Sequence, residues 1–372
     1  MKEIIYADNA ATTHLSPKAL EKMLPYLEDK YGNASQFYSF ARSPKKALKE
    51  SREVIAECIG SLPEEIYFTS CGTESDNWVI AGAVKLQLPI ITSLIEHHAI
   101  LRPCEVAKKN GCKVDYLPVS IKGVVDTFGL DQKMKNSSSG LLSVMFANNE
   151  IGTIQPISKL AKIAHQHGWY FHTDAVQAIG HTPINVKEMG IDMLSASAHK
   201  FNGPKGIGFL YIKKDIEWPS IILGGAQENN HRAGTENVAS IVGMATALQE
   251  NVSRLDENMK HLFKLEMLLV QGLQNSGVCF LRNGGDEHVY GNVSLSFPGY
   301  DGEAIMHRLD LLGIEVSTGS ACDSKETQIS HVLKSLGIEA NIARGTIRIS
   351  LGRYNTEMDV VRIVDALVKI LK

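Results

Sequence analysis

The chain has 372 residues, of which 44% are hydrophobic and 21% are charged. That size provides for a large core and, we expect, two domains. The formal net charge of −3 argues against a broad basic surface for nucleic acid or for an anionic membrane. The N-terminal residues lack the apolar core of a signal peptide, and no apolar run is long enough to span a bilayer. We therefore expect a cytoplasmic protein that binds neither membrane nor nucleic acid directly.

Strand-like and helix-like patterns alternate from about residue 50 to about residue 250. The expected strands are Glu65–Thr69, Ile90–Thr92, Gly140–Phe146, Trp169–His172 and Gly208–Ile212. The expected helices are Pro44–Ile59, one beginning at Glu74, and Ile157–His167. Such alternation is typical of an α/β fold, in which helices cover both faces of a mostly parallel sheet.

The pattern changes after a long amphipathic helix, which we expect near Val238–Gly272. Three strand patterns and a closing helix then predict a smaller α+β unit, over Val289–Phe297, Gly313–Ser317, Thr346–Ser350 and Thr356–Leu371. We expect a large domain at residues 15–255 and a small domain at residues 1–14 and 256–372.

The six cysteines include no Cys-x-x-Cys pair and no neighbouring histidine cluster, which argues against a zinc site and against a disulfide framework. We expect no metal centre. Cys322 differs from the others, because it lies among small and polar residues from Glu315 to Lys325. This setting suits an accessible thiol. Lys325 would lower the pKa of that thiol and Asp323 would raise it, so the net effect stays open.

Lys200 lies between small residues and a histidine, just before the apolar strand Gly208–Ile212. A lysine in such a place tends to lose its charge, and the neutral amine is then a nucleophile able to form a Schiff base. Most lysines beside a strand simply point to water, so this signal alone is weak. Asp174, at the end of another expected strand, could pair with the pyridinium nitrogen of pyridoxal phosphate. Together, Lys200 and Asp174 suggest a pyridoxal-phosphate enzyme.

A glycine turn at Gly72 and Thr73 joins a strand to the start of a helix. Free backbone N–H groups and the helix dipole make such a place suitable for a phosphate. The alternative is an ordinary helix cap, in which Thr73 caps the first turn that contains Asp76. Without other evidence, the ordinary cap is the better interpretation.

Two further strand ends carry polar side chains that could face a cofactor. His97 could stack on a ring or move protons, although adjacent histidines such as His97 and His98 are more often exposed. Asn149 could hydrogen-bond a ring hydroxyl, although by itself it fits a loop or a helix cap better.

Three arginines, Arg344, Arg348 and Arg353, occur within ten residues around one strand. An arginine fork binds a carboxylate in two-pronged fashion, as an amino-acid substrate requires. Surface charge is the commoner role, and the residues alone do not choose among the three.

Taken in order, these motifs resemble the class V, fold type I pyridoxal-phosphate enzymes, and specifically the cysteine desulfurases of the NifS/IscS kind. The likeness runs nearly end to end. It is carried by Tyr6–Thr13, Thr73–Ser75, Glu96–His97, Asn148–Pro156, Asp174–Gln177, His199–Lys200, Arg232–Asn237, Gly319–Cys322 and Ser350–Tyr354. The resemblance implies a large domain with a mostly parallel seven-stranded sheet, and a smaller α+β domain that carries the loop of the catalytic cysteine.

The resemblance implies pyridoxal 5'-phosphate as the cofactor. Lys200 would attach it covalently, Asp174 would hold its pyridine nitrogen, and His97 would stack on its ring and shuttle protons. The other implied contacts are Asn149 and Gln177 for the ring oxygen, and Gly72, Thr73, Ser197, His199 and, from the partner subunit of a homodimer, Thr235 for the phosphate.

The same resemblance implies the reaction. Arg348, with Asn149, would bind the substrate L-cysteine, and Lys200 would remove its α-proton. Cys322 would attack the substrate sulfur, which leaves a persulfide on the enzyme and releases L-alanine. The spacing from Cys322 to His331 resembles a subgroup that delivers sulfur to an acceptor protein, such as an iron–sulfur scaffold, or toward tRNA thiolation.

The chain also departs from the family pattern. The phosphate turn has Cys71 within Ser-Cys-Gly-Thr-Glu-Ser, where the family reads Ser-Gly-Ala-Thr-Glu-Ser. Residues 33–38 lack the family's proline and histidine, and residues 225–231 lack its basic run. Two other functions stay open: a selenocysteine lyase or another class V lyase or aminotransferase, and a catalytically silent partner of a sulfur carrier. Activity without Cys322 would mark the first, and a colourless protein would mark the second.

Overall fold

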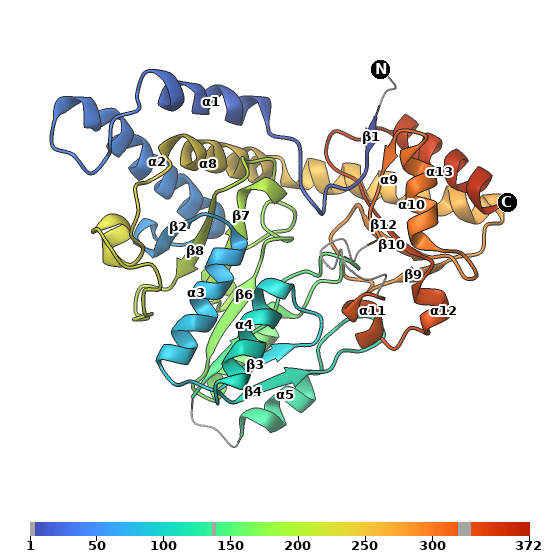
Figure 1. Ribbon diagram of the computed structural model, residues 1–372, viewed down its shortest axis with the longest axis horizontal. Coiled ribbons are helices and arrows are strands. Elements are labelled where there is room, and N and C mark those ends of the chain that lie inside the picture. Colours follow the sequence, from blue (N-terminus) through green and yellow to red (C-terminus); the bar gives the residue numbers. More distant parts are fainter. Residues whose placement is uncertain (1–3, 136–138, 319–328) are drawn as a thin grey trace.

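The computed structural model describes residues 4–135, 139–318 and 329–372 (Figure 1). In these residues, no helix combines the length and the apolar character needed to cross a membrane. Two groups of elements are visible in Figure 1: one around a large sheet and one that contains the C-terminal helices.

The large sheet of the described chain has seven strands in the order β2-β8-β7-β6-β5-β3-β4. They are β2 (Ile66–Thr69), β8 (Gly208–Ile212), β7 (Met193–Ser197), β6 (Tyr170–Asp174), β5 (Leu141–Ser143), β3 (Ile90–Ser93) and β4 (Val114–Leu117). All pairings are parallel except those of β8 with β2 and β7. The expected mostly parallel seven-stranded α/β sheet is confirmed.

Helices cover both faces of this sheet. They are α2 (Arg42–Ile59), α3 (Gly72–Lys85), α4 (His98–Lys109), α5 (Thr127–Met134), α6 (Ile157–Gln166), α7 (Val186–Met189) and α8 (Val238–Ser253), and α1 (Pro17–Glu28) packs on α8. Successive strand residues point to opposite faces, so Met193 packs in the core beneath α3 and α4 whereas Leu194 packs in the core beneath α2, α6 and α8. Burial on both faces explains why these strands read as apolar runs.

The second group surrounds two small sheets. One has the order β12-β10-β9 and is antiparallel, and the other pairs β1 with β11 in parallel. Their strands are β1 (Ile5–Tyr6), β9 (Leu281–Asn283), β10 (Asn292–Ser296), β11 (Ile314–Glu315) and β12 (Thr346–Ser350). The helices are α9 (Leu255–Ser276), α10 (Gly302–Asp310), α11 (His331–Ser335), α12 (Ala340–Ala343) and α13 (Glu357–Leu371). Ile5 and Ala7 pack into the core formed by these elements, and Figure 1 shows β1 among the orange and red segments.

The expectation of one helix near Val238–Gly272 is wrong. Helix α8 ends at Ser253 and α9 begins at Leu255. Arg254, between them, has φ −118° and ψ 20°, so the chain leaves the helical conformation there. Its guanidinium lies 2.9 Å from Glu257 in the first turn of α9. The periodic apolar pattern continues across this break, which is why the sequence hides it.

Strand β7 was missing from the sequence prediction. Its residues read Met-Leu-Ser-Ala-Ser, and small polar residues are a weak strand signal. All five residues are buried, because helices cover both faces of the strand. Ser195 and Ser197, two residues apart, point to the face that α3 covers. A short 3-10 helix, η3 (Ala198–Lys200), follows this strand directly and ends at Lys200.

Candidate active site

A pocket of about 300 Å³ opens at the carboxyl ends of the parallel strands, the edge at which α/β sheets bind their ligands. Segments that follow β3, β6 and β7 reach it, together with the first turns of α3 and strand β12. Its lining residues are Ala10, Ala11, Cys71, Gly72, Thr73, Asp76, His97, Met145, Asn149, Asp174, Val176, Gln177, Ser197, His199, Lys200 and Arg348. Among the predicted site residues that the structure describes, the fold thus brings together all except Thr235.

The Lys200 amine contacts the N-terminal segment of the chain. Its Nζ donates to the carbonyl oxygens of Ala10 at 2.6 Å and of Ala11 at 2.8 Å. Its positive charge also acts on the pocket, because it lowers the pKa values of Asp174 and His97. Lys200 and Asp174, whose pairing the sequence suggested, line one pocket.

Asp174 is the last residue of β6 and is almost fully buried. Burial raises the pKa of its carboxyl to about 6, while the hydrogen bond from the Val176 N–H, at 2.9 Å, and the charge of Lys200 oppose that rise. A carboxylate at the bottom of a pocket suits a ring nitrogen that carries a proton.

His97 is the N-cap of α4, and its Nδ1 accepts a hydrogen bond from the Ala99 N–H at 3.1 Å. An accepting Nδ1 leaves the single proton of the neutral ring on Nε2. Burial lowers the pKa of His97 to about 4, with further lowering by Lys200 and His98. The His98 ring contacts His331 instead, with 4.9 Å between centroids. Only His97 of the pair lines the pocket.

This depressed pKa gives the first testable prediction. In the apoprotein, the His97 ring should stay neutral from about pH 6 to pH 8, because its pKa of about 4 lies below this range. His288 offers an internal comparison: burial lowers its pKa, but Glu266 at 2.8 Å more than offsets this and raises it above 6.5. NMR of ring resonances should show His288 titrating while His97 does not. A His97 transition in this range would contradict the burial argument.

The amino end of α3 forms a cradle at one end of the pocket. Helix α3 begins at Gly72, and its N-cap, Cys71, makes no side-chain cap hydrogen bond. The alternative interpretation of Thr73 as an ordinary cap is therefore wrong, and the first N–H groups of α3 are left for a ligand. Ser197 faces the same pocket, and its buried Oγ has no hydrogen-bond partner in the described part of the chain. Such an orphaned hydroxyl fits a phosphate oxygen.

Ser197 gives the second prediction. Replacing it by alanine should raise the stability of the apoprotein by about 1 kcal/mol, because a buried unsatisfied hydroxyl is removed. The same change should weaken cofactor binding about tenfold, because a hydrogen bond to a charged group is lost. Ser195→Ala is the matched control, since the Ser195 Oγ lies 3.0 Å from His172 Nε2, and its loss should lower stability. Thermal unfolding of the apoproteins and cofactor titration measure both effects. A parallel change in both quantities for Ser197→Ala would contradict the assignment.

Of the three candidate arginines, Arg348 is the one that lines the pocket. It is 4% exposed, its Nη1 donates to Asn149 O at 3.0 Å, and its Nη2 lies 2.5 Å from Asp8 Oδ1. Its Nε is buried without a hydrogen-bond partner among the described residues.

The other two arginines have different surroundings. Arg344 is exposed, and Arg353 pairs with Glu250 at 3.1 Å. Arg348 is thus positioned for a substrate carboxylate.

The remaining predicted residues fall into three groups. Gln177 donates from Nε2 to Ala10 O at 2.9 Å, and His199 lies 3.2 Å from Thr12 Oγ1, both beside the pocket. Thr235 lines a different and smaller cavity, with Arg232 and Glu236. Cys322 lies outside the described residues.

Sequence reasoning missed Asp76 as a pocket residue, as well as Met145, Val176 and the Ala10 and Ala11 carbonyls. Asp76 was interpreted only as part of a helix-cap pattern. Its distance of four residues from Gly72 could have placed it on the same face of α3 as the phosphate turn. The contact of Ala10 is made by its backbone carbonyl, which every residue type has, so the sequence does not predict it.

The residues present fit pyridoxal phosphate. The cradle of α3 and the orphaned Ser197 hydroxyl suit its phosphate, the buried Asp174 carboxylate suits its ring nitrogen, and Lys200 suits its aldehyde. Each match rests on a different part of the pocket.

Comparisons with known proteins agree with this geometry. The family model of class-V aminotransferases matches residues 5–363. "Cysteine desulfurase IscS" of Dictyoglomus turgidum is 45% identical, over 100% of this chain and 95% of that protein. The solved structure of a "NIFS-like protein" has a TM-score of 0.92 at 37% identity, with 99% of both chains covered. "SspA in complex with cysteine" has a TM-score of 0.84 at 33% identity, over 96% of this chain and 100% of that one. The chain therefore belongs to the class-V aminotransferase family of pyridoxal-phosphate enzymes, among the cysteine desulfurases of the NifS/IscS kind.

Proposed function

We propose that this protein is a pyridoxal-phosphate-dependent cysteine desulfurase, which converts L-cysteine to L-alanine and forms a persulfide on Cys322. The observation that carries the proposal is a single pocket that contains the Lys200 amine, the Asp174 carboxylate and the Arg348 guanidinium. Full-length relatives named as cysteine desulfurases support the choice of substrate.

Each pocket residue has a task in this reaction. The cofactor, when bound, supplies an electron sink that makes the α-proton of an amino acid removable. Arg348 binds the substrate carboxylate and thereby fixes the orientation of the α-carbon. Once its amine has lost the positive charge, Lys200, which lines the pocket with Asp174, accepts the α-proton at Nζ. The neutral ring of His97 holds a proton on Nε2 and can donate it.

Sulfur transfer requires a second thiol. The Cys322 thiolate attacks the sulfur of the bound cysteine, so that an S–S bond forms while the C–S bond breaks. The electron pair of the broken bond stays with the carbon skeleton, which takes up a proton and leaves as alanine. The persulfide sulfur then passes to a thiol of an acceptor protein.

The wider assembly is also part of the proposal. Two copies of the chain form a homodimer in which Thr235 of each copy reaches the phosphate site of the other. That Thr235 lines another cavity of its own chain supports this arrangement. We assign residues 15–255 to a large domain and residues 1–14 and 256–372 to a small one, and the packing of Ile5 with the C-terminal core supports the division. The sulfur acceptor belongs to iron–sulfur cluster assembly or to tRNA thiolation.

The test is release of alanine and sulfide from L-cysteine in the presence of a thiol reductant, with Cys322→Ala and Cys279→Ala in parallel. Cys279 is an exposed free cysteine and serves as the matched control. We expect wild type and Cys279→Ala to turn over, and Cys322→Ala to keep its yellow cofactor but release no sulfide. Equal activity of Cys322→Ala, or its activity on selenocysteine alone, would replace the proposal by a lyase. A colourless wild-type protein would indicate a silent partner.

A further inference from the structure

A buried polar cluster lies between α3 and the sheet, directly behind the pocket. It consists of Asp76, Ser143, His172 and Ser195, each at most 1% exposed. Ser143 and His172 are register partners on β5 and β6, and Ser195 follows on β7. Their side chains share the face that α3 covers, because the intervening residues point into the opposite core. Asp76 comes from the second turn of α3.

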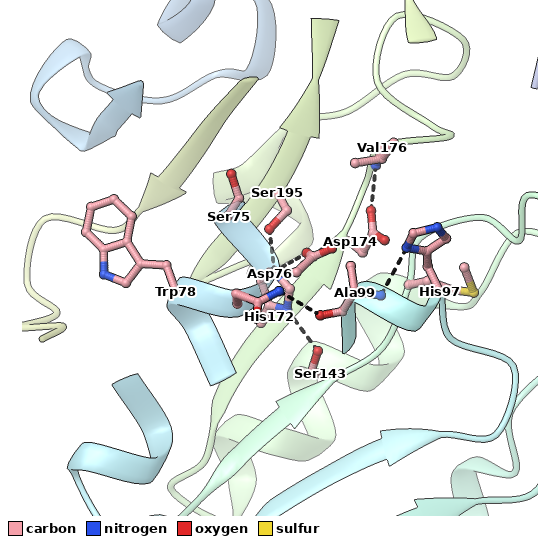
Figure 2. Close-up of polar contacts among 12 residues, drawn as sticks. Ser75, Asp76, Trp78, His97, Ala99, Ser143, His172, Asp174, Val176 and Ser195 are labelled. Atoms are coloured by element: carbon pink, nitrogen blue, oxygen red, sulfur yellow. Dashed lines mark hydrogen bonds and ion pairs between the residues drawn. The ribbon is translucent and has the colours of Figure 1, made fainter. Parts of the chain in front are cut away.

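The cluster is organised around His172, whose ring Figure 2 shows with its partners. Its Nδ1 lies 2.9 Å from Ser143 Oγ, and its Nε2 lies 3.0 Å from Ser195 Oγ. The Asp76 Oδ1 is farther from Nε2, at 3.8 Å, which is too long for a hydrogen bond. Burial lowers the pKa of His172 to about 3, so the ring is neutral and gives Asp76 no positive charge.

Asp76 therefore lacks the support that a buried carboxylate needs. Its Oδ1 has no hydrogen-bond partner among the described residues, and His172 is the only basic side chain there within 4.0 Å. An ionised carboxylate without a partner in such a site is strongly disfavoured. Burial raises the pKa of Asp76, the negative charge of Asp174 raises it further, and a hydrogen bond with Ser195 opposes this rise.

Asp76 and Asp174 line the same pocket, and their charges interact. Two buried carboxyls in one site do not both ionise near neutral pH. Asp174 is the better place for the negative charge, because it receives the Val176 N–H at 2.9 Å and feels the charge of Lys200. The proton is left to Asp76.

We propose that Asp76 is a positioning residue of this site: a carboxylic acid that keeps its proton and so leaves the negative charge on Asp174. The proposal rests on the assignment of the pocket to pyridoxal phosphate, whose ring nitrogen Asp174 holds. With Asp76 neutral, that nitrogen meets a single full carboxylate charge. The serines and the neutral His172 ring lie next to Asp76 without adding a competing charge.

Infrared spectroscopy of the holoenzyme tests the protonation state directly. With aspartate carboxyls labelled with carbon-13, wild type at pH 7 should show a C=O stretch of a protonated carboxylic acid. Asp76→Asn should lose this band, and Asp215→Asn, a change at an exposed turn residue, should keep it. Absence of an acid band in wild type, or its survival in Asp76→Asn, would overturn the proposal.

The coupling to Asp174 supplies a second measurement, which does not require the Asp76 variant to fold. In Asp174→Asn, the acid band should disappear at a pH about one unit lower or more than in wild type, because the neighbouring charge is gone. An unchanged midpoint would refute the coupling. Neither spectrum depends on cysteine turnover, so failure of the desulfurase assay and failure of this proposal are distinguishable.

Cofactor affinity gives the readout that a purely structural role would not produce. Asp76→Asn preserves the neutral state and should weaken binding of pyridoxal phosphate by less than about threefold, whereas Asp174→Asn should weaken it at least tenfold. Equal losses in the two variants would mean that Asp76 carries a charge of its own, and the proposal would fail.

Discussion

Replacing Lys200 by alanine is expected to lower turnover of L-cysteine by about 10³-fold or more, because one change removes both the amine that attaches the cofactor and the base for the α-proton. The variant Lys200→Arg tests whether activity needs the lysine amine itself or only its positive charge. It keeps a cation that could still donate to the Ala10 and Ala11 carbonyls and act on Asp174, but it offers no nucleophilic amine. We therefore expect Lys200→Arg to be as inactive as Lys200→Ala.

The matched control is Lys205→Ala, since Lys205 is exposed and lies in the next turn of the chain, between η3 and β8. It should keep full turnover. Borohydride reduction followed by mass spectrometry should show cofactor mass on wild type and on Lys205→Ala, and none on either Lys200 variant. Turnover by Lys200→Arg within tenfold of wild type would show that the amine matters only as a charge.

The sequence predicted those parts of the fold in which residue type determines the backbone. The alternation of helices and strands is such a part, because burial of both sheet faces requires apolar runs at regular intervals. Strand β8 and helix α13 were located to within one residue. Strand β7 was missed because serine has a low strand propensity. Ser195 is buried there because it contacts His172, and strand propensity does not report such a contact. The break at Arg254 was missed because it depends on one backbone conformation.

The site was predictable to the extent that its chemistry requires particular residues. Lys200 and Asp174 could be paired because pyridoxal-phosphate chemistry needs both a lysine amine and a carboxylate for the ring nitrogen. The choice of Arg348 over Arg344 came from the resemblance, and burial now gives it a physical basis. Two features depend on three-dimensional packing, which one sequence does not specify: the carbonyls that accept from Lys200, and the lack of a partner for the Ser197 hydroxyl among the described residues.

Replacing Arg348 by lysine is expected to raise the KM for L-cysteine about 10²-fold, with a smaller effect on kcat. The guanidinium presents two parallel N–H groups to a carboxylate, and a lysine ammonium cannot reproduce that fork. A 10²-fold change in affinity corresponds to about 2.7 kcal/mol, which is within the range of about 1.5–3 kcal/mol for one hydrogen bond to a charged group. Arg348 also balances Asp8, which lies 2.5 Å from Nη2, and lysine keeps that charge balance in the free enzyme.

Arg344→Lys is the control, because Arg344 is exposed in the segment that leads into β12. It should leave KM and kcat unchanged. Steady-state kinetics would separate the two outcomes, and cysteamine, which lacks the carboxylate, sharpens the test. Any slow turnover of cysteamine should be equal in wild type and Arg348→Lys, because the lost contact is to a group that cysteamine does not have. A KM for L-cysteine that stays constant in Arg348→Lys, or a loss of the same size with cysteamine, would assign Arg348 to folding of the pocket through Asp8 and Asn149 instead of to substrate binding.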